Sequence, residues 1–373
     1  PERAYIGASP LDVREGIHDL KRLNTIKTWQ EGSMAEKWIY WLEDVGKEDN
    51  ELVGKKCANL GEIAKAGLPV PKGFCLSVDA YALFMELTGA AKEIGRLLET
   101  HMPEAEDVEG IRRLSRAMRQ AVESKPLPPE MTDMILSYYG ELCSRTRTLD
   151  AAVSTRSAGT VSHPGQYETY LNVKGQEDLI EKTRKVWAST FNERSLAFRI
   201  KKGMPIGNEP IGVAVLAMVQ ARSAGIAFSA DPNTGDTARI IVEANWGLGE
   251  SVVSGELMPD RWVLDKETLG IRERTLGRKE KSTICLDCGI QDAELSPEMA
   301  CSFCLEDEEL KEIARMANKL EHHFGQPQDI EWAVVQDRPF PNIVLLQTRP
   351  VVISKQEPVD QVLDLMVGML NFP

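Results

Sequence analysis

The chain has 373 residues, of which 42% are hydrophobic and 27% charged, as in soluble globular proteins with two or three domains or one bilobed one. Its formal net charge of −13 argues against nucleic acids and anionic membrane surfaces, since both attract basic proteins. No stretch reaches the roughly 18 apolar residues of a membrane span, and the start lacks a secretion signal, so we expect a cytoplasmic protein.

The first half of the chain predicts an extension and then a helix-rich lobe. Residues 1–37 are polar and without sustained periodicity, which is typical of an extension or arm. Residues 38–204 are assigned to the first lobe. The elements predicted in it are a buried strand at 38–42, a short helix at 59–67 that ends at a glycine, several helices within 77–145, and one helix over 179–202.

The second half predicts a lobe of strands at residues 205–354, with a cysteine-containing insert at 280–305 and a tail at 355–373. The tail has apolar residues at helical spacing, which predict a surface for a partner or packing against its own lobe. Strands mixed with helices indicate an α/β or α+β class. The predicted elements are strands at 212–219, 226–229, 239–243, 261–265, 330–335 and 343–347, and a helix over 306–324.

The last two of these strands carry the most informative polar residues. Asp329 and Glu331 alternate along one strand, and Gln347 and Arg349 along the next, so each pair lies on one face of its strand. If the strands form a hairpin, the four side chains share a face and offer oxygen ligands for Mg²⁺ and a guanidinium for phosphate. The alternative is a solvated sheet face with a cross-strand salt bridge.

Two clusters in the first lobe are basic. Arg156 stands among small hydroxyl residues and glycines at 154–160, a composition typical of a mobile phosphate-binding loop or of a plain surface turn. Lys56 stands just before the predicted helix at 59–67, where its charge adds to the positive end of the helix. The alternative for Lys56 is a solvated lysine.

Four of the seven cysteines form two Cys-x-x-Cys pairs, Cys285 with Cys288 and Cys301 with Cys304, separated by 12 residues. Paired knuckles of this kind hold a structural Zn²⁺ through four thiolates. Reduced, buried thiols are the alternative. An odd number of cysteines in a long chain argues against a secreted disulfide framework.

Taken in order, these segments resemble the nucleotide-binding domain of the phosphoenolpyruvate synthase and pyruvate phosphate dikinase family. The resemblance implies a bilobed ATP-grasp fold, α/β (α+β), with a nucleotide cleft between the lobes. One departure stands out, because Lys55 and Cys57 replace glycines of the family's Gly-Gly-Lys-Gly run. The segments that carry the resemblance are 54–60, 67–74, 156–158, 165–172, 224–232, 247–255, 259–260, 329–332 and 347–350.

The resemblance also implies roles for single residues. Catalysis would rest on cations that contact the phosphates, namely Lys56, Arg156 and Arg349. Mg²⁺ would be held by Asp329, Glu331 and Gln347. The residues implied in ATP binding are Lys56, Arg156, Gly165 in a closing loop, Val215 and Met218 beside adenine, Glu243, Glu331, Gln347 and Arg349.

Relatives in this family pass the phosphoryl group to a histidine on a swivelling domain, which we do not find in this sequence. We therefore expect a separately encoded partner subunit that bears the histidine, with release of AMP and phosphate. A likeness in architecture to phenylphosphate synthase implies phenol as the final acceptor, and pyruvate, as in phosphoenolpyruvate synthase, is the alternative. A self-contained ATP-grasp ligase or kinase and a non-catalytic nucleotide-sensing subunit are hypotheses from other classes.

Overall fold

The structure, a computed structural model, describes residues 37–160, 167–207, 209–253, 255 and 257–353. The predicted extension at 1–37, apart from Lys37, lies outside the described residues, as do Gly165 and the predicted tail at 355–373. The described chain divides into two compact units. Unit 1 contains the chain up to Ala58 and Lys72–Ala217, and unit 2 contains Asn59–Pro71 and the chain from Met218 onward.

Unit 1 is built on a five-stranded sheet in the order β1-β2-β5-β3-β4, in which every neighbouring pair is antiparallel. Strand β5 is central, since it pairs with β2 on one side and β3 on the other. The strands are β1 (Ile39–Trp41), β2 (Gly73–Leu76), β3 (Val153–Ala158), β4 (Thr169–Val173) and β5 (Gly212–Ala217).

The place of β5 corrects the predicted lobe boundary. The sequence prediction starts a second lobe at residue 205, so that the strand at 212–219 belongs to it. In the structure this strand completes the sheet of unit 1, and the division falls after Ala217. Strand β5 belongs to unit 1 because it pairs with β2 and β3, which are far away in the sequence. A local sequence pattern does not predict such pairing.

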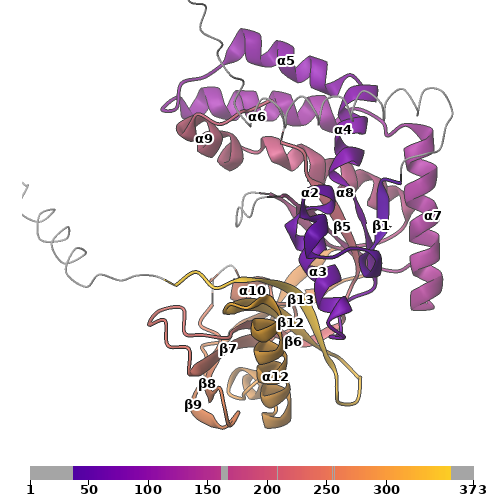
Figure 1. Ribbon diagram of the computed structural model, residues 1–373. Helices are drawn as coiled ribbons and strands as arrows, with labels where there is room; N and C mark the ends of the chain where they lie inside the picture. The colour runs from indigo at the N-terminus through magenta and orange to yellow at the C-terminus, as the bar shows by residue number, and fades with distance from the viewer. Residues whose placement is uncertain (1–36, 161–166, 208, 254, 256, 354–373) are drawn as a thin grey trace, which may run out of the picture. The chain divides into compact units, whose positions relative to one another are not determined.

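The helices of unit 1 pack on this sheet and on one another around buried aromatic rings, among them Tyr81, Phe84 and Trp187. Figure 1 shows α5, α6 and α9 as neighbouring helices. Helix α3 (Lys55–Lys65) begins in unit 1 and continues into unit 2. The other helices up to α9 are α2 (Asn50–Val53), α4 (Val78–Leu87), α5 (Ala90–His101), α6 (Val108–Glu123), α7 (Pro129–Thr146), α8 (Gln176–Ala188) and α9 (Glu193–Lys202).

The helix predicted over 179–202 is two helices in the structure. Helix α8 ends at Ala188, and a short 3-10 turn at Ser189–Phe191 precedes α9. Asn192 has an extended backbone, and its side chain accepts a hydrogen bond from the amide of Ser195, so it caps a new helix. The apolar periodicity runs through both helices, which is why the sequence prediction joined them.

Unit 2 is built on a six-stranded antiparallel sheet in the order β13-β12-β6-β7-β8-β9. The predicted strands are all present, several of them longer than predicted. The strands are β6 (Ala221–Phe228), β7 (Arg239–Trp246), β8 (Asp260–Asp265), β9 (Ile271–Thr275), β12 (Gln328–Val335) and β13 (Ile343–Pro350).

Helix α12 (Asp307–Phe324) covers one face of this sheet and contacts β6, β7 and β12 (Figure 1). Its buried residues include Leu310, Ile313 and Leu320, which recur at helical spacing, as the sequence predicts. Residues of β12 that alternate with Asp329 and Glu331, such as Ile330 and Trp332, are fully buried. The strands of unit 2 therefore have one apolar face and one polar face.

The predicted cysteine insert is a small antiparallel hairpin followed by a short helix. Strand β10 (Lys281–Cys285) pairs with β11 (Ile290–Glu294), and α11 (Pro297–Ala300) follows, while α10 (Glu250–Val253) lies earlier in the chain. The fully buried ion pair between Lys279 and Asp260 connects the base of this hairpin to β8.

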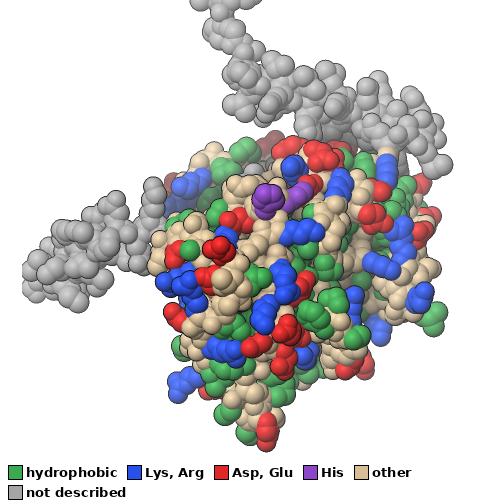
Figure 2. All heavy atoms as spheres, turned by 60° about the horizontal axis from the view of Figure 1, so that its bottom comes forward, with side chains coloured by type: hydrophobic (Ala, Val, Ile, Leu, Met, Phe, Trp, Pro, Cys, Tyr) green, Lys and Arg blue, Asp and Glu red, His purple; other side chains and the backbone are tan. Residues whose placement is uncertain are grey.

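No helix among the described residues is both long and apolar enough to cross a membrane. On the face displayed in Figure 2, basic and acidic side chains are interspersed with hydrophobic ones.

Candidate functional site

Strands β12 and β13 place four predicted site residues directly opposite one another. Asp329 pairs with Arg349, and Glu331 pairs with Gln347. Cross-strand partners have side chains on the same face of the sheet, so the predicted common face is confirmed. Arg349 Nε donates to Asp329 Oδ2 at 2.7 Å. The hairpin thus presents two carboxylates, one amide and one guanidinium on the polar face of unit 2.

Burial and the neighbouring arginine have opposite effects on the pKa of the Asp329 carboxyl. Burial raises its pKa, the charge and hydrogen bond of Arg349 lower it, and the nearby Glu331 raises it, with a net upward shift. A carboxylate in such surroundings gains from a second cation, because more positive charge would offset the cost of its burial.

Glu243 belongs to the same face. Glu331 pairs with Ile226 on β6, and Ile226 pairs with Glu243 on β7, so the two glutamates lie on one cross-strand row. With strands about 4.8 Å apart, their Cα atoms are about 10 Å apart. Glu243 is in turn opposite Arg261 on β8, and the Nε of Arg261 is 3.6 Å from Glu243 Oε1.

Arg261 lies on the same face as the predicted site residues, and the sequence prediction did not include it. Burial raises the pKa of Glu243, and the charge of Arg261 opposes that shift. The sequence shows Arg261 only as the first residue of a predicted strand. The sheet register is what places it beside Glu243, and the register depends on pairing between strands that are separated in sequence.

The structure places the two predicted basic residues of unit 1 differently from the prediction. Arg156 lies within strand β3, not in a loop, and pairs with Ala214 on β5 and Thr169 on β4. Helix α3 starts at Lys55, four residues earlier than predicted, so Lys56 lies in its first turn and not before it.

Gly54 joins these two parts of unit 1. Its φ is +78°, and a Cβ built on it would lie 1.9 Å from the carbonyl oxygen of Ala158 at the end of β3. The amide of Lys55 donates to the carbonyl of Gly159 at 2.9 Å. Only glycine permits this approach, which fixes the start of α3 against the end of the strand that carries Arg156.

The two residues predicted beside adenine differ in their surroundings. Val215 is fully buried in the central strand β5 and pairs with Phe74 on one side and Thr155 on the other. Its backbone groups are directed at the neighbouring strands, so the predicted contact with adenine is not supported at Val215. Met218 comes just after the end of β5 and lies outside the sheet ladder.

The residues next to β4 form a network that the sequence prediction also missed. Glu168 accepts from two nitrogens of Arg119, at 2.5 and 3.2 Å, and from the hydroxyl of Tyr170. The hydroxyl of Tyr167 donates to Glu209, and the same hydrogen bond together with burial raises the pKa of Tyr167. These contacts fix the residues that immediately precede Thr169, the partner of Arg156 in the sheet.

The cysteines are not gathered as a metal site. Within the part of the chain that the structure describes, no group of three or more His, Cys, Asp or Glu side chains is arranged to hold a metal ion. Cys304 is buried beside Asp260, and both burial and that carboxylate raise its pKa, which disfavours the thiolate that Zn²⁺ needs. Cys288 and Cys301 are exposed, so the Zn²⁺ hypothesis gains no support from this arrangement.

The described histidines lie on helices. His101 ends α5, and His322 and His323 lie in the last turn of α12. The ring of His323 is hydrogen bonded to Glu62 at 2.6 Å. His163 lies outside the described residues.

Carboxylate, amide and guanidinium groups, such as those on the β12–β13 hairpin, are the kinds of group that Mg²⁺ and phosphates prefer, and a helix start favours anions. The chain belongs to the family described as the pyruvate phosphate dikinase, AMP/ATP-binding domain, whose model matches residues 50–366.

Curated relatives with similar sequences are phosphoenolpyruvate synthases of archaea. The probable phosphoenolpyruvate synthase of Staphylothermus marinus is 36% identical over 344 residues, covering 84% of this chain and 41% of the relative. The phosphoenolpyruvate synthase of Pyrococcus furiosus is 34% identical over 367 residues, covering 87% of this chain and 45% of the relative. The chain therefore spans less than half the length of these relatives.

Proposed function

We propose that this chain binds Mg·ATP as the nucleotide-binding part of a dikinase-type phosphotransferase. The observation that carries the proposal is the cross-strand pairing of Asp329 with Arg349 and of Glu331 with Gln347. It supplies oxygen ligands and a phosphate-binding fork on one face, in a chain that belongs to an AMP/ATP-binding family.

The residues present fit a magnesium ion. Mg²⁺ in phosphoryl-transfer sites takes one or two carboxylates, with substrate phosphates and water as its other ligands. Asp329, Glu331 and the amide oxygen of Gln347 provide such a set, and the raised pKa of Asp329 is relieved by an added cation. When bound, the ion would neutralise charge on the phosphate oxygens.

The cations of the chain would bind and orient the phosphates. Arg349 is held by Asp329, which fixes the direction of its guanidinium and leaves its outer nitrogens to meet phosphate oxygens. Lys55 and Lys56 both lie in the first turn of α3, where the positive end of the helix repels them. An anion at this helix start would offset that repulsion, so we assign phosphate contacts to Lys56 and to Arg156 on β3, whose end contacts Gly54 just before the helix.

The acceptor is proposed from the relatives. Their names favour pyruvate, with phosphoenolpyruvate as product, over the phenol that the architecture suggested. The phosphoryl group would pass through a histidine on a partner subunit, with AMP and phosphate as the other products. His322 and His323 lie in the last turn of α12, the helix that covers the apolar sheet face, away from the face that carries Asp329 and Glu331.

Calorimetric titration with Mg·ATP tests the binding part of this proposal. We expect micromolar affinity for the chain, reduced at least about tenfold by Lys56→Ala or Glu331→Gln, because each removes a charged contact with the phosphates or their metal. Lys65→Ala, at the other end of α3, is the matched control and should bind as the unsubstituted chain does. Undiminished binding by both site variants would refute the assigned site.

A further inference from the structure

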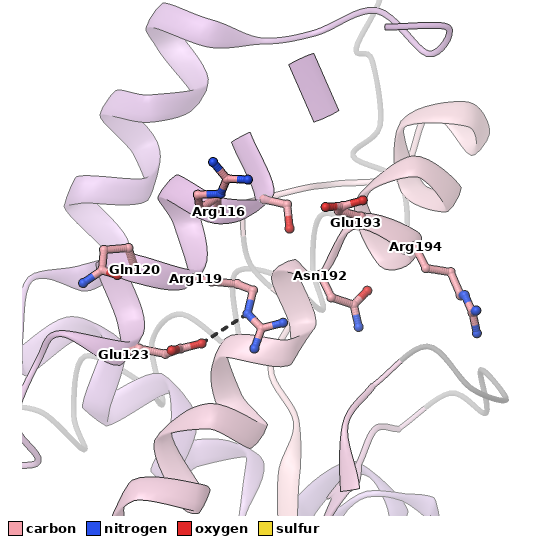
Figure 3. Close-up of a pocket in the computed structure, with 8 residues that line it drawn as sticks. Arg116, Arg119, Gln120, Glu123, Asn192, Glu193 and Arg194 are labelled. Carbon is pink, nitrogen blue, oxygen red and sulfur yellow. Dashed lines mark hydrogen bonds and ion pairs between the residues drawn. The ribbon is translucent and has the colours of Figure 1, made fainter. Parts of the chain in front are cut away.

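A groove between α6 and the start of α9 lies within unit 1 and is not used by the proposed function. Its volume is about 590 Å³, which is in the range of small-molecule sites. Figure 3 shows Arg116, Arg119 and Glu123 reaching into it from α6, with Asn192 and Glu193 at the start of α9. The lining is polar and contains three arginines, since Arg194 also contributes.

Among the charged residues that line the groove, Arg116 can contact a bound anion without breaking an ion pair within the described residues. Glu123 is paired with Arg119 at 3.1 Å, and Glu193 is paired with Arg112, outside the groove, at 3.4 Å. Both lining acids thus already have arginine partners. Arg116 is exposed and forms no ion pair with any described residue. The protein as a whole is acidic, with a net charge of −13, so this cluster of arginines is a local exception.

The backbone at this end of the groove adds to the positive potential. Asn192 caps α9, a helix of ten residues, and α9 directs its positive end toward the groove. Guanidinium groups, a side-chain amide and a helix start are the groups that bind carboxylate and phosphate oxygens.

Arg119 connects the groove to β4, the strand that pairs with Arg156 on β3. It donates to Glu168, at 2.5 and 3.2 Å, while its Nε contacts Glu123 inside the groove. Glu168 directly precedes Thr169, whose sheet partner is Arg156. An anion in the groove would therefore compete with Glu168 for Arg119.

We propose that this groove is a second anion site, which binds a small molecule with carboxylate or phosphate groups through Arg116 and Arg119. Occupation draws Arg119 away from Glu168 and loosens the strand that pairs with Arg156. The site itself does not depend on the proposed function. Its consequence, weaker binding of Mg·ATP when the anion is bound, rests on that function.

The test is a titration of the chain with two probes, inorganic phosphate and malonate, at constant ionic strength and without ATP. A Lys56→Ala background weakens binding of phosphate at the proposed nucleotide site. We expect saturable binding of at least one probe, and the stronger probe identifies the ligand as a phosphate or a carboxylate. Arg116→Ala should weaken binding at least about fivefold, as expected for an exposed charged contact.

Arg113→Ala is the matched control, because Arg113 is exposed on the same helix and does not line the groove. It should change binding less than about twofold, since it removes only distant charge. Glu168→Gln should strengthen binding, because Arg119 loses its competing carboxylate. The proposal is overturned if neither probe saturates, if the two arginine variants weaken binding equally, or if Glu168→Gln has no effect.

These outcomes are separate from the proposed function. If the chain did not bind Mg·ATP, the proposed function would fail, but the titrations with phosphate and malonate would still test the groove. If Mg·ATP binds, bound malonate should lower its affinity in the unsubstituted chain, and the same concentration of malonate should lower it less in Arg116→Ala.

Discussion

Single residues on the polar face of unit 2 are held by cross-strand contacts. Asp329 and Arg349 form a half-buried pair, and Glu243 and Arg261 form a looser one across β7 and β8. In both pairs burial raises the pKa of the acid and the arginine opposes the shift. We therefore expect these pairs to affect stability, and the Asp329–Arg349 pair also to affect the proposed binding of phosphate.

Arg349→Ala should reduce phosphoryl transfer at least about a hundredfold, as loss of a transition-state charge contact does. It should also lower the free energy of unfolding by about 1–3 kcal/mol, because it leaves the carboxylate of Asp329 without its partner. The first effect can be measured by activity with the proposed histidine-bearing partner, and the second by denaturant unfolding. Arg338→Ala, in the exposed turn of the same hairpin, is the control, and an active Arg349→Ala protein would refute the role.

Glu243→Gln should change how stability depends on pH. Between its pKa in the unfolded chain and its higher pKa in the folded protein, the carboxyl of Glu243 binds more protons in the folded state. Stability therefore falls as pH rises from the first of these pKa values through the second. The stability of Glu243→Gln relative to the unsubstituted chain should therefore increase from pH values below the ordinary glutamate pKa toward neutrality. Unfolding midpoints across this pH range measure it, and a decrease would contradict the burial argument.

At the scale of elements, the start of α3 and the end of β3 depend on each other. The contact of Gly54 with Ala158 and the hydrogen bond from Lys55 to Gly159 fix the helix start next to the strand that carries Arg156. The proposed phosphate contacts of Lys56 and Arg156 rely on this junction.

Gly54→Ala should destabilise the protein by at least about 3 kcal/mol. The added methyl group clashes with the carbonyl oxygen of Ala158, and alanine is strained at a positive φ. Gly89→Ala is the matched control, since Gly89 also has a positive φ, +74°, but has no atom within 4 Å of the added methyl group. It should cost only about 1–2 kcal/mol. Chemical unfolding of both variants measures the difference, and equal losses would show that the contact with Ala158 is unimportant.

At the scale of the whole molecule, the products of the reaction identify the class of enzyme. A dikinase with a histidine-bearing partner transfers the β-phosphoryl group and leaves AMP, whereas a self-contained kinase or ligase leaves ADP or acts without the partner. We expect ATP labelled at the β-phosphate to label the partner's histidine, and ATP labelled at the γ-phosphate to release its label as phosphate. Formation of ADP by the chain alone would instead favour the kinase or ligase.

Much of the fold could be predicted from the sequence because local signals were strong. The helix at 306–324 was predicted from apolar spacing and corresponds to α12, and the polar face of β12 and β13 was predicted from alternation. The error at 179–202 arose because one apolar periodicity spans two helices, which are separated by the 3-10 turn at Ser189–Phe191 and the cap at Asn192.

The sequence by itself indicated which residue types could bind Mg·ATP. It also determined that Asp329 shares a strand face with Glu331, and Gln347 with Arg349, because strand alternation is local and has a period of two. The structure added the pairing that brings all four onto one face. Only the tertiary structure decided that β5 belongs to unit 1, that Arg261 lies opposite Glu243, and that Arg119 links the groove to Glu168. These facts depend on contacts between segments far apart in the chain, and local pattern contains no record of which distant strand or helix will supply the partner.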